Sequence, residues 1–231
     1  MVLSSRANEI LDMVNKFGQV SASDLAQSLT VSVETIRRDL KKLDERGELT
    51  RVHGGAVSKQ YQDAGTSFNR RANSNVEAKQ ALVNKALSYF YEGAVIGLDA
   101  STSSWLVAQA MPDRKCTVVT HSQNNIAVLA DKNNINVICL GGHYSKKHNA
   151  FYGQLTKQAL STMSLDFSVI SCSGYGPGIG VWDSNEYNCE VKQALIASAD
   201  TCILIADKTK LNKKSLIKVC DMESISVVVT N

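Results

Sequence analysis

Residues 21–55, SASDLAQSLTVSVETIRRDLKKLDERGELTRVHGG, decide the fold of the first part of this chain. Ser32 is a residue type that caps helix N-termini well. Ile36, Leu40 and Leu43 follow it at spacings of four and three, which predicts a helix with one buried face. A shorter helical stretch lies just before it, across a tight turn. The pattern predicts a helix-turn-helix.

The sequence on either side extends this unit. Apolar residues at helical spacing predict a further helix over residues 5–17. Residues 49–57 contain a Gly-Gly pair and are typical of two short strands around a turn. We therefore expect a winged helix-turn-helix domain over residues 1–57.

Basic side chains lie on the outward face of the helix that Ser32 begins. Arg and Lys there can bind DNA phosphates, and an Arg near the helix start can also reach a guanine edge in the major groove. Residues 1–57 hold eight Lys/Arg and eight Asp/Glu, so a solvated face on a three-helix interaction module is the alternative. The predicted DNA contacts are Ser32, Thr35, Arg37, Arg38, Lys41, Arg51 and His53.

The rest of the chain alternates helical stretches with short apolar strands. Residues 58–76 are polar and are predicted to be a linker, which leaves 77–231 as a second domain. Helices are expected at 77–91, 102–110, 122–130, 153–162 and 186–199, and strands at 94–98, 117–120, 136–140, 167–171, 202–206 and 226–230. This order indicates an α/β fold with a mainly parallel sheet covered on both faces.

Polar or glycine-rich loops follow the strands of this second domain. Such sheets bind ligands at the carboxyl ends of their strands. Residues 98–104 pass from a strand to a helix with small hydroxyl side chains, a setting that suits an anion at a helix N-terminus. Residues 120–122, 141–142 and 174–178 follow the next strands. We expect these loops to converge on one pocket.

Composition excludes several classes of protein. The net charge is +3 and 44% of the residues are hydrophobic, as in globular proteins. No apolar run approaches the ~18 residues of a transmembrane helix, and the first residues lack a signal peptide, so we expect a cytoplasmic protein without membrane contact. The six cysteines show no Cys-x-x-Cys spacing, which favours reduced thiols and no metal; no cofactor is expected.

The N-terminal motif resembles the DeoR family of bacterial transcription regulators. The matching residues are Val31-Ser-Val-Glu-Thr-Ile-Arg-Arg-Asp-Leu40, then Leu43, Gly47 and Arg51-Val-His-Gly-Gly-Ala56. In that family this segment is a winged helix that binds operator double-stranded DNA. The resemblance implies that Ser32 to Arg46 is the recognition helix and that Leu49 to Val57 is the wing.

The second domain is similar to the sensor domain of the same family. The residues that match lie at Phe68, Arg71, Lys79, Asp99, Ser101–Ser103, Thr120–Ser122, Gly141-Gly142, Glu190–Lys192 and Asp207–Lys210. His121 stands where the family usually has Asn. Ala100-Ser101, Trp105 and Val181–Asn185 resemble the branch that regulates L-fucose operons. The family's sensor fold is similar to ribose-phosphate isomerases and CoA transferases.

The resemblance implies a phosphorylated monosaccharide as effector, such as fuculose phosphate. Its phosphate would lie on the loop at 101–104 with Lys210 and Lys192 as charge partners. The expected effector site comprises Asp99, Ser101, Thr102, Ser103, Thr120, His121, Ser122, Gly141, Gly142, Asp183, Asn185, Lys192 and Lys210. A homo-oligomer is expected because one winged helix reads few bases.

Two other functions fit part of the sequence. The acidic residues and lysines of the expected pocket allow a sugar-phosphate isomerase with an accessory domain. The winged helix can also serve a protein-binding adaptor. The N-terminal motif favours the regulator, which we expect not to be an enzyme, because an isomerase has no need of this motif.

Overall fold

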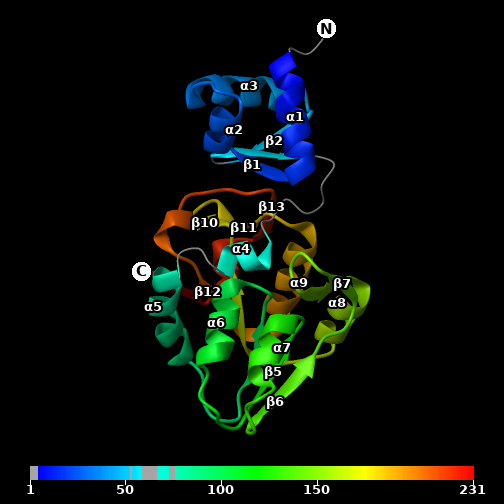
Figure 1. Cartoon of the computed structure of the whole chain (residues 1–231). Helices are drawn as coiled ribbons and strands as arrows, with labels where there is room; N and C mark the ends of the chain where they lie inside the picture. Colours follow the sequence, from blue (N-terminus) through cyan, green and yellow to red (C-terminus); the bar gives the residue numbers. More distant parts are fainter. Residues whose placement is uncertain (1–4, 53, 59–66, 73–75) are drawn as a thin grey trace.

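The computed structural model describes residues 5–52, 54–58, 67–72 and 76–231. A smaller N-terminal domain lies above a larger α/β domain, and the C-terminus lies on the latter (Figure 1). No helix among these residues combines the length and the apolar character needed to cross a membrane.

The N-terminal domain packs helices on a small antiparallel sheet of order β1-β3-β2. Ile10, Leu25, Ile36, Leu40 and Leu43 are nearly inaccessible to solvent and form its core. The described elements are α1 (Ser5–Phe17), β1 (Gln19–Ser21), α2 (Ala22–Ser28), α3 (Val33–Glu45), β2 (Leu49–Val52) and β3 (Gly55–Ser58). The predicted winged helix-turn-helix is confirmed.

Serine hydroxyls cap both α2 and α3, and the cap at Ser32 is the one that the sequence predicts. The Ser21 hydroxyl accepts a hydrogen bond from the Asp24 amide at 3.0 Å, and the Ser32 hydroxyl accepts one from the Thr35 amide at 3.2 Å. Strand β1 was not expected from the sequence. It forms because Val20 pairs with Ala56, a partner that local periodicity cannot indicate.

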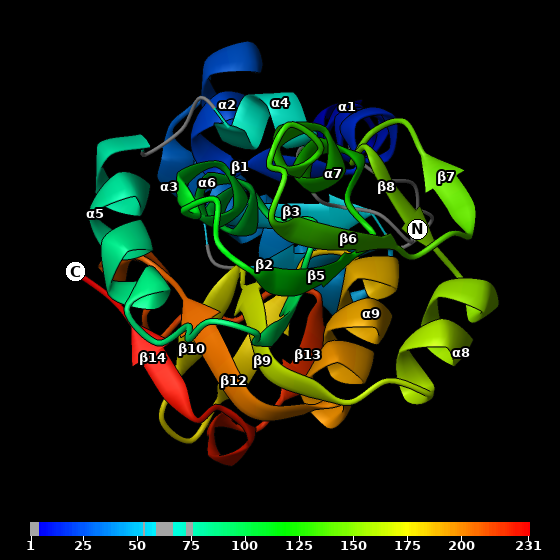
Figure 2. The ribbon, with the colours of Figure 1, turned by 90° about the horizontal axis from the view of Figure 1, so that it is seen from below.

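The C-terminal domain is built on six parallel strands in the order β14-β12-β9-β4-β5-β6. Helices α5, α6 and α7 cover one face, and α8 and α9 cover the other (Figure 2). The strands are β4 (Val95–Leu98), β5 (Cys116–Thr120), β6 (Ile135–Cys139), β9 (Leu165–Ser171), β12 (Ala199–Ile205) and β14 (Val227–Val229). The helices are α5 (Val76–Leu87), α6 (Thr102–Ala110), α7 (Gln123–Leu129), α8 (Gln154–Ser161) and α9 (Glu186–Ala197). The predicted covered parallel sheet is confirmed.

Short antiparallel strands form small sheets separate from this one. Residues 174–178, predicted as a glycine-rich loop, instead begin with a strand that pairs with its neighbour. One three-stranded sheet comprises β10 (Gly174–Gly176), β11 (Gly180–Asp183) and β13 (Ile217–Cys220); a hairpin comprises β7 (His143–Ser145) and β8 (Ala150–Tyr152). This domain also contains two 3-10 turns, η1 (Lys208–Lys210) and η2 (Met222–Ser224).

The predicted linker contains a helix that the sequence did not indicate. Helix α4 (Phe68–Ala72) packs on α6, and the Phe68 ring meets Trp105 edge to face with centroids 5.9 Å apart. Phe68 is 4% exposed, and its amide donates to the Lys147 carbonyl at 3.0 Å. Residues 59–66 and 73–75 of the same stretch lie outside the described residues. The domain boundaries stay predictions.

Candidate functional site

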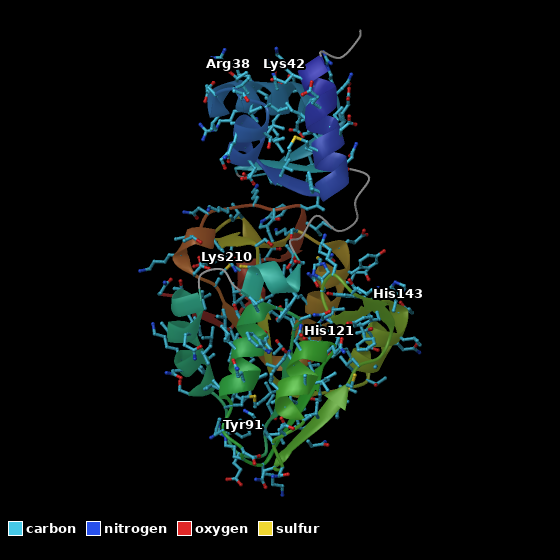
Figure 3. The ribbon with its side chains drawn as sticks, in the orientation of Figure 1. Arg38, Lys42, Tyr91, His121, His143 and Lys210 are labelled. Atoms are coloured by element: carbon cyan, nitrogen blue, oxygen red, sulfur yellow. The ribbon has the colours of Figure 1, made fainter. Side chains whose placement is uncertain are left out.

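Helix α3 presents basic side chains to solvent. Arg37, Arg38, Lys41 and Lys42 are all exposed, and Thr35 is half-buried at the start of the helix. Arg38 and Lys42 lie on the side of the N-terminal domain that faces away from the C-terminal domain (Figure 3). Neither forms an ion pair within the described part of the chain. This surface is therefore open to a large partner.

The other charges of α3 form weak pairs along the helix. Arg37 lies 3.4 Å from Glu34, and Lys41 lies 3.8 Å from Glu45. Exposed pairs of this kind contribute little to stability, so phosphate can replace them at small cost. Ser32 and Thr35 share a hydrogen bond of 2.9 Å between their hydroxyls.

The predicted DNA contacts of the wing are Arg51 and His53, and their contact with DNA stays a prediction. Arg51 lies on β2 and is exposed, but it lines a cavity with Val52 and with Lys214 and Ser215 of the C-terminal domain. Its amide donates to the Asp44 carboxylate at 3.1 Å, which ties β2 to the end of α3. His53 lies outside the described residues.

A second candidate site lies at the carboxyl ends of β4 and β5. Its lining residues are Arg71, Asp99, Ala100, Ser101, His121, Asn188 and Lys192. The empty space is about 200 Å³ including the open mouth.

Asp99 organises the floor of this pocket. One carboxylate oxygen accepts from the Ser101 amide at 3.0 Å and the Ser104 hydroxyl at 2.6 Å; the other accepts from the Ser171 amide at 3.0 Å. Burial alone would raise the pKa of Asp99, but the Lys192 ammonium and these hydrogen bonds hold it below its usual value. Asp99 is therefore an anion that fixes the loop.

Lys192 lines the pocket and connects the carboxyl ends of three strands. Its ammonium donates to the Ser171 carbonyl at 2.6 Å, contacts Asp183, and lies 3.4 Å from Asp99. Burial would lower the pKa of Lys192, yet the two carboxylates raise it above its ordinary value. Asp183 also accepts from the amides of Ser184 and Asn185. Asp183 itself does not line the pocket.

The hydroxyl-rich loop begins helix α6. Ser101 caps the helix by accepting from the Ser104 amide at 3.0 Å. Thr102 and Ser103 are buried in the first turn, where backbone amides have no partner within the helix. Amides in this position favour an anion.

His121 is a buried polar ring without a hydrogen-bond partner among the described residues. It is 1% exposed, and neither ring nitrogen is hydrogen-bonded. Tyr152 packs against it edge to face, with centroids 5.4 Å apart. Burial lowers the pKa of His121 to about 4, so the ring is neutral near pH 7. A neutral imidazole offers one donor and one acceptor to whatever enters the pocket.

Other predicted residues hold the loops instead of lining the pocket. Thr120 donates to the Leu98 carbonyl and accepts from the Ser122 amide and from Asn125. Ser122 caps α7, and Asn185 caps α9. The polar groups of these side chains therefore form hydrogen bonds within the protein that hold the loops and helix ends.

Gly141, Gly142 and Lys210 also lie outside the lining. Gly141 and Gly142 connect β6 to β7, and the Gly141 carbonyl accepts from Thr156. The Lys210 ammonium lies 3.4 Å from the Ser171 hydroxyl (residue labelled in Figure 3). Contact of these residues with an effector stays a prediction.

The expected site omitted several residues that the fold brings to it. Arg71 and Asn188 line the pocket, and Asn188 accepts a hydrogen bond from the Tyr152 hydroxyl at 2.6 Å. His148 lies between Arg71, at 3.4 Å, and Asn185, at 3.3 Å. Asn188 is one helical turn from Asn185, a signal that the sequence did offer. His148 belongs to the turn between β7 and β8, and nothing local marks it.

Among the described residues, no group of three His, Cys, Asp or Glu side chains is placed to hold a metal ion.

Comparison with known proteins identifies the family of this chain. Residues 6–62 match the DeoR-like helix-turn-helix domain, and residues 74–231 match the DeoR C terminal sensor domain. The chain belongs to the DeoR family. It is therefore a DNA-binding transcription regulator, in agreement with the sequence prediction.

Relatives span nearly the whole chain. The L-fucose operon activator of Haemophilus influenzae is 45% identical over 98% of this chain and 91% of its own. That of Escherichia coli is 30% identical over 99% and 95%. Among solved structures, the sorbitol operon regulator SorC from Klebsiella pneumoniae aligns with a TM-score of 0.45 at 12% identity, over 99% of this chain and 97% of its own.

Proposed function

We propose that this DeoR regulator binds operator DNA through α3 and that a phosphorylated sugar in the pocket of the C-terminal domain controls this binding. The observation that carries the proposal is that the α6 N-terminus and the buried His121, whose ring has no hydrogen-bond partner among the described residues, meet in one pocket. The helix end suits a phosphate, and the neutral ring suits a sugar hydroxyl.

The names of the relatives suggest the sugar. Two of them are L-fucose operon activators, so we propose an L-fucose catabolite such as fuculose phosphate as effector. Its phosphate would lie against residues 101–104 with Lys210 nearby. Lys192 is already bound to two carboxylates, so in this proposal it supports the pocket floor rather than neutralising the phosphate.

The isomerase alternative has less support. Asp99, a carboxylate that lines the pocket, accepts hydrogen bonds from two amides and a hydroxyl and lies beside an ammonium group. A general base must be able to accept a proton from substrate, and these contacts oppose that. We infer that the domain senses its ligand without converting it.

We also propose that the chain acts as a homo-oligomer. The exposed face of one α3 can reach only a few bases, whereas a dimer contacts two half-sites about one helical turn apart. Light scattering of the protein alone and on its operator tests this, and a monomer in both conditions contradicts it.

Calorimetry with the full chain tests the effector proposal. Fuculose phosphate should bind at least tenfold more tightly than free fuculose, and Ser101→Ala should weaken that binding. Ser161→Ala is the matched control because Ser161 is exposed on α8, away from the pocket. Equal affinity for the phosphorylated and free sugar contradicts a phosphate site.

A further inference from the structure

We propose that the open cavity between the two domains binds a small phosphate-bearing anion, held by Arg51 of β2 and by Lys214 of the segment between η1 and β13. Val52 and Ser215 also line this cavity. It shares no described lining residue with the pocket of the C-terminal domain. The inference therefore goes beyond the proposed function and does not depend on it.

The cavity lies where the sheet of the N-terminal domain faces the C-terminal domain. Figure 1 shows β1 and β2 on that side of the N-terminal domain and α3 on the opposite side. The volume of the cavity is about 320 Å³. Pockets that bind small molecules usually have volumes of ~300–1,000 Å³, so a small ligand has room in this one.

The charged side chains of the described lining are both cationic. Arg51 comes from the N-terminal domain and Lys214 from the C-terminal domain, and both residues are exposed. Neither forms an ion pair within the part of the chain that the structure describes. Two cations that line one cavity repel each other, and an anion between them replaces this repulsion by attraction to both. The cavity therefore favours a negatively charged ligand.

The donors that line the cavity match a phosphate group. A phosphate monoester carries close to two negative charges near pH 7 and has three acceptor oxygens. One such group can accept from the guanidinium fork of Arg51, the ammonium of Lys214 and the hydroxyl of Ser215. A carboxylate carries one charge and has two oxygens, so it satisfies fewer of these donors.

Each of the two cations is connected to a further site within its own domain. The Arg51 amide donates to the Asp44 carboxylate at 3.1 Å, and Asp44 lies on α3. The Lys214 ammonium lies 5.5 Å from the centroid of the Trp182 ring. Trp182 belongs to β11, which ends at Asp183, and Asp183 contacts the lysine that lines the pocket. An anion in the cavity thus joins the strand that contacts α3 to the segment that contacts the pocket floor.

The consequence is a contact between the domains that depends on a ligand. A bound anion attracts both cations and so holds β2 against the segment before β13, whereas without the anion two like charges oppose this contact. The anion binds this arrangement more tightly than one in which the domains lie apart. Its binding therefore shifts the population toward the arrangement seen here.

Fluorescence of Trp182 reports on the cavity because the Lys214 ammonium lies against this ring. The chain has two tryptophans, so Trp105→Phe leaves Trp182 as the only one. The probes are inorganic pyrophosphate and inorganic phosphate, titrated into the full-length Trp105→Phe protein at an ionic strength that sodium chloride keeps constant. Circular dichroism melting confirms that this protein and each further variant are folded.

Arg51→Met is the decisive variant because Arg51 and Trp182 belong to different domains. Its matched control is Arg46→Met, since Arg46 is exposed in the same domain and is not among the described lining residues. Both probes should change the fluorescence of Trp182 to saturation. Arg51→Met should weaken pyrophosphate binding at least tenfold, whereas Arg46→Met should keep it within twofold. Ser101→Ala, a change in the pocket, should also keep it within twofold.

Calorimetry tests Lys214, whose replacement would alter the fluorescence directly. In a Ser101→Ala background, where the pocket is impaired, Lys214→Met should weaken pyrophosphate binding at least tenfold. Lys208→Met is the control for the lost charge, because Lys208 is exposed on η1 of the same segment and is not among the described lining residues. Equal binding by the two lysine variants contradicts the inference.

The results separate this inference from the proposed function. No response of Trp182, or a response that Arg51→Met leaves within twofold, overturns the interdomain site and says nothing against the pocket. If neither probe binds and Lys214→Met weakens operator binding, the cavity is a contact for DNA phosphates and the inference fails. Fuculose phosphate should bind Arg51→Met as it binds the wild type, so its failure to bind the wild type contradicts the proposed function alone.

Discussion

Asp99 and Lys192 face each other inside the C-terminal domain, with a carboxylate oxygen of one 3.4 Å from the ammonium nitrogen of the other. Asp99 follows β4 and Lys192 lies on α9, so the pair joins the pocket floor to a helix on the opposite face of the sheet. Lys192 also contacts Asp183. The buried ammonium of Lys192 thus compensates the charge of two buried carboxylates.

Removing this cation should destabilise the domain strongly. We predict that Lys192→Met lowers the free energy of unfolding by ~3–5 kcal/mol, because it leaves uncompensated buried charge. Lys157→Met is the control: its pair with Glu190, at 3.0 Å, is about one-third exposed and should contribute less than ~1 kcal/mol. Urea unfolding measures both.

A second change checks the cause of that loss. Adding Asp183→Asn to Lys192→Met removes one of the two stranded charges and should recover part of the lost stability. No recovery, or a loss equal to that of Lys157→Met, contradicts the buried-charge account.

His121 should make stability depend on pH. Burial lowers its pKa to about 4, whereas the unfolded ring titrates near its ordinary value of 6.5. Between these values the unfolded state binds the proton and the folded state does not, so stability falls as pH falls from 6.5 to 4. The slope is about 1.4 kcal/mol per pH unit for one proton.

Replacement of the ring tests this assignment. His121→Asn should reduce the slope of unfolding free energy against pH by about that amount across the window. His143→Asn is the control, because it removes a histidine ring that is exposed on β7 and does not line the pocket. An unchanged slope in the His121 variant would show that the proton binds elsewhere.

Sequence periodicity predicted the elements whose signals are local. Helix α3 follows from the Ser32 cap and the spacing of Ile36, Leu40 and Leu43, and the central strands follow from continuous apolar runs. The sheet of β10, β11 and β13 was not predicted. Its strands have only three or four residues, and β11 pairs with a strand more than thirty residues further along the chain. No local sequence pattern therefore predicts this sheet.

The sequence likewise predicted only part of the candidate site. Asp99, Ser101, His121 and Lys192 line one pocket, as their places at strand ends and on α9 allow. Thr120, Ser122 and Asn185 have the same polar character but are used as caps and loop supports. Residue type and spacing cannot separate these two uses, because the difference lies in which way each side chain turns. Arg71 reaches the pocket through a tertiary contact of α4.

The glycine pair after β6 should have unequal roles. A Cβ at Gly142 would lie 2.4 Å from both the Tyr152 carbonyl and the Thr156 hydroxyl, and its φ of 151° disfavours other residues. A Cβ at Gly141 would meet nothing within 4 Å. We predict that Gly142→Ala costs ~1–3 kcal/mol of stability and Gly141→Ala less than ~0.5 kcal/mol. Similar costs measured by thermal unfolding would contradict this.

The last prediction concerns the DNA surface. Arg38 is exposed on α3 without an ion-pair partner in the described residues, whereas Arg37 lies 3.4 Å from Glu34. Arg38→Ala should weaken operator binding by ~1–3 kcal/mol if Arg38 reads a base. If it contacts phosphate, the variant should instead weaken all DNA sequences alike and reduce the slope of log affinity against log salt by about one. Anisotropy titrations at several salt concentrations distinguish these outcomes, with Lys115→Ala as the control for charge. Wild-type affinity and salt slope in Arg38→Ala, and again in Arg37→Ala with Arg38→Ala, would show that α3 does not carry DNA binding.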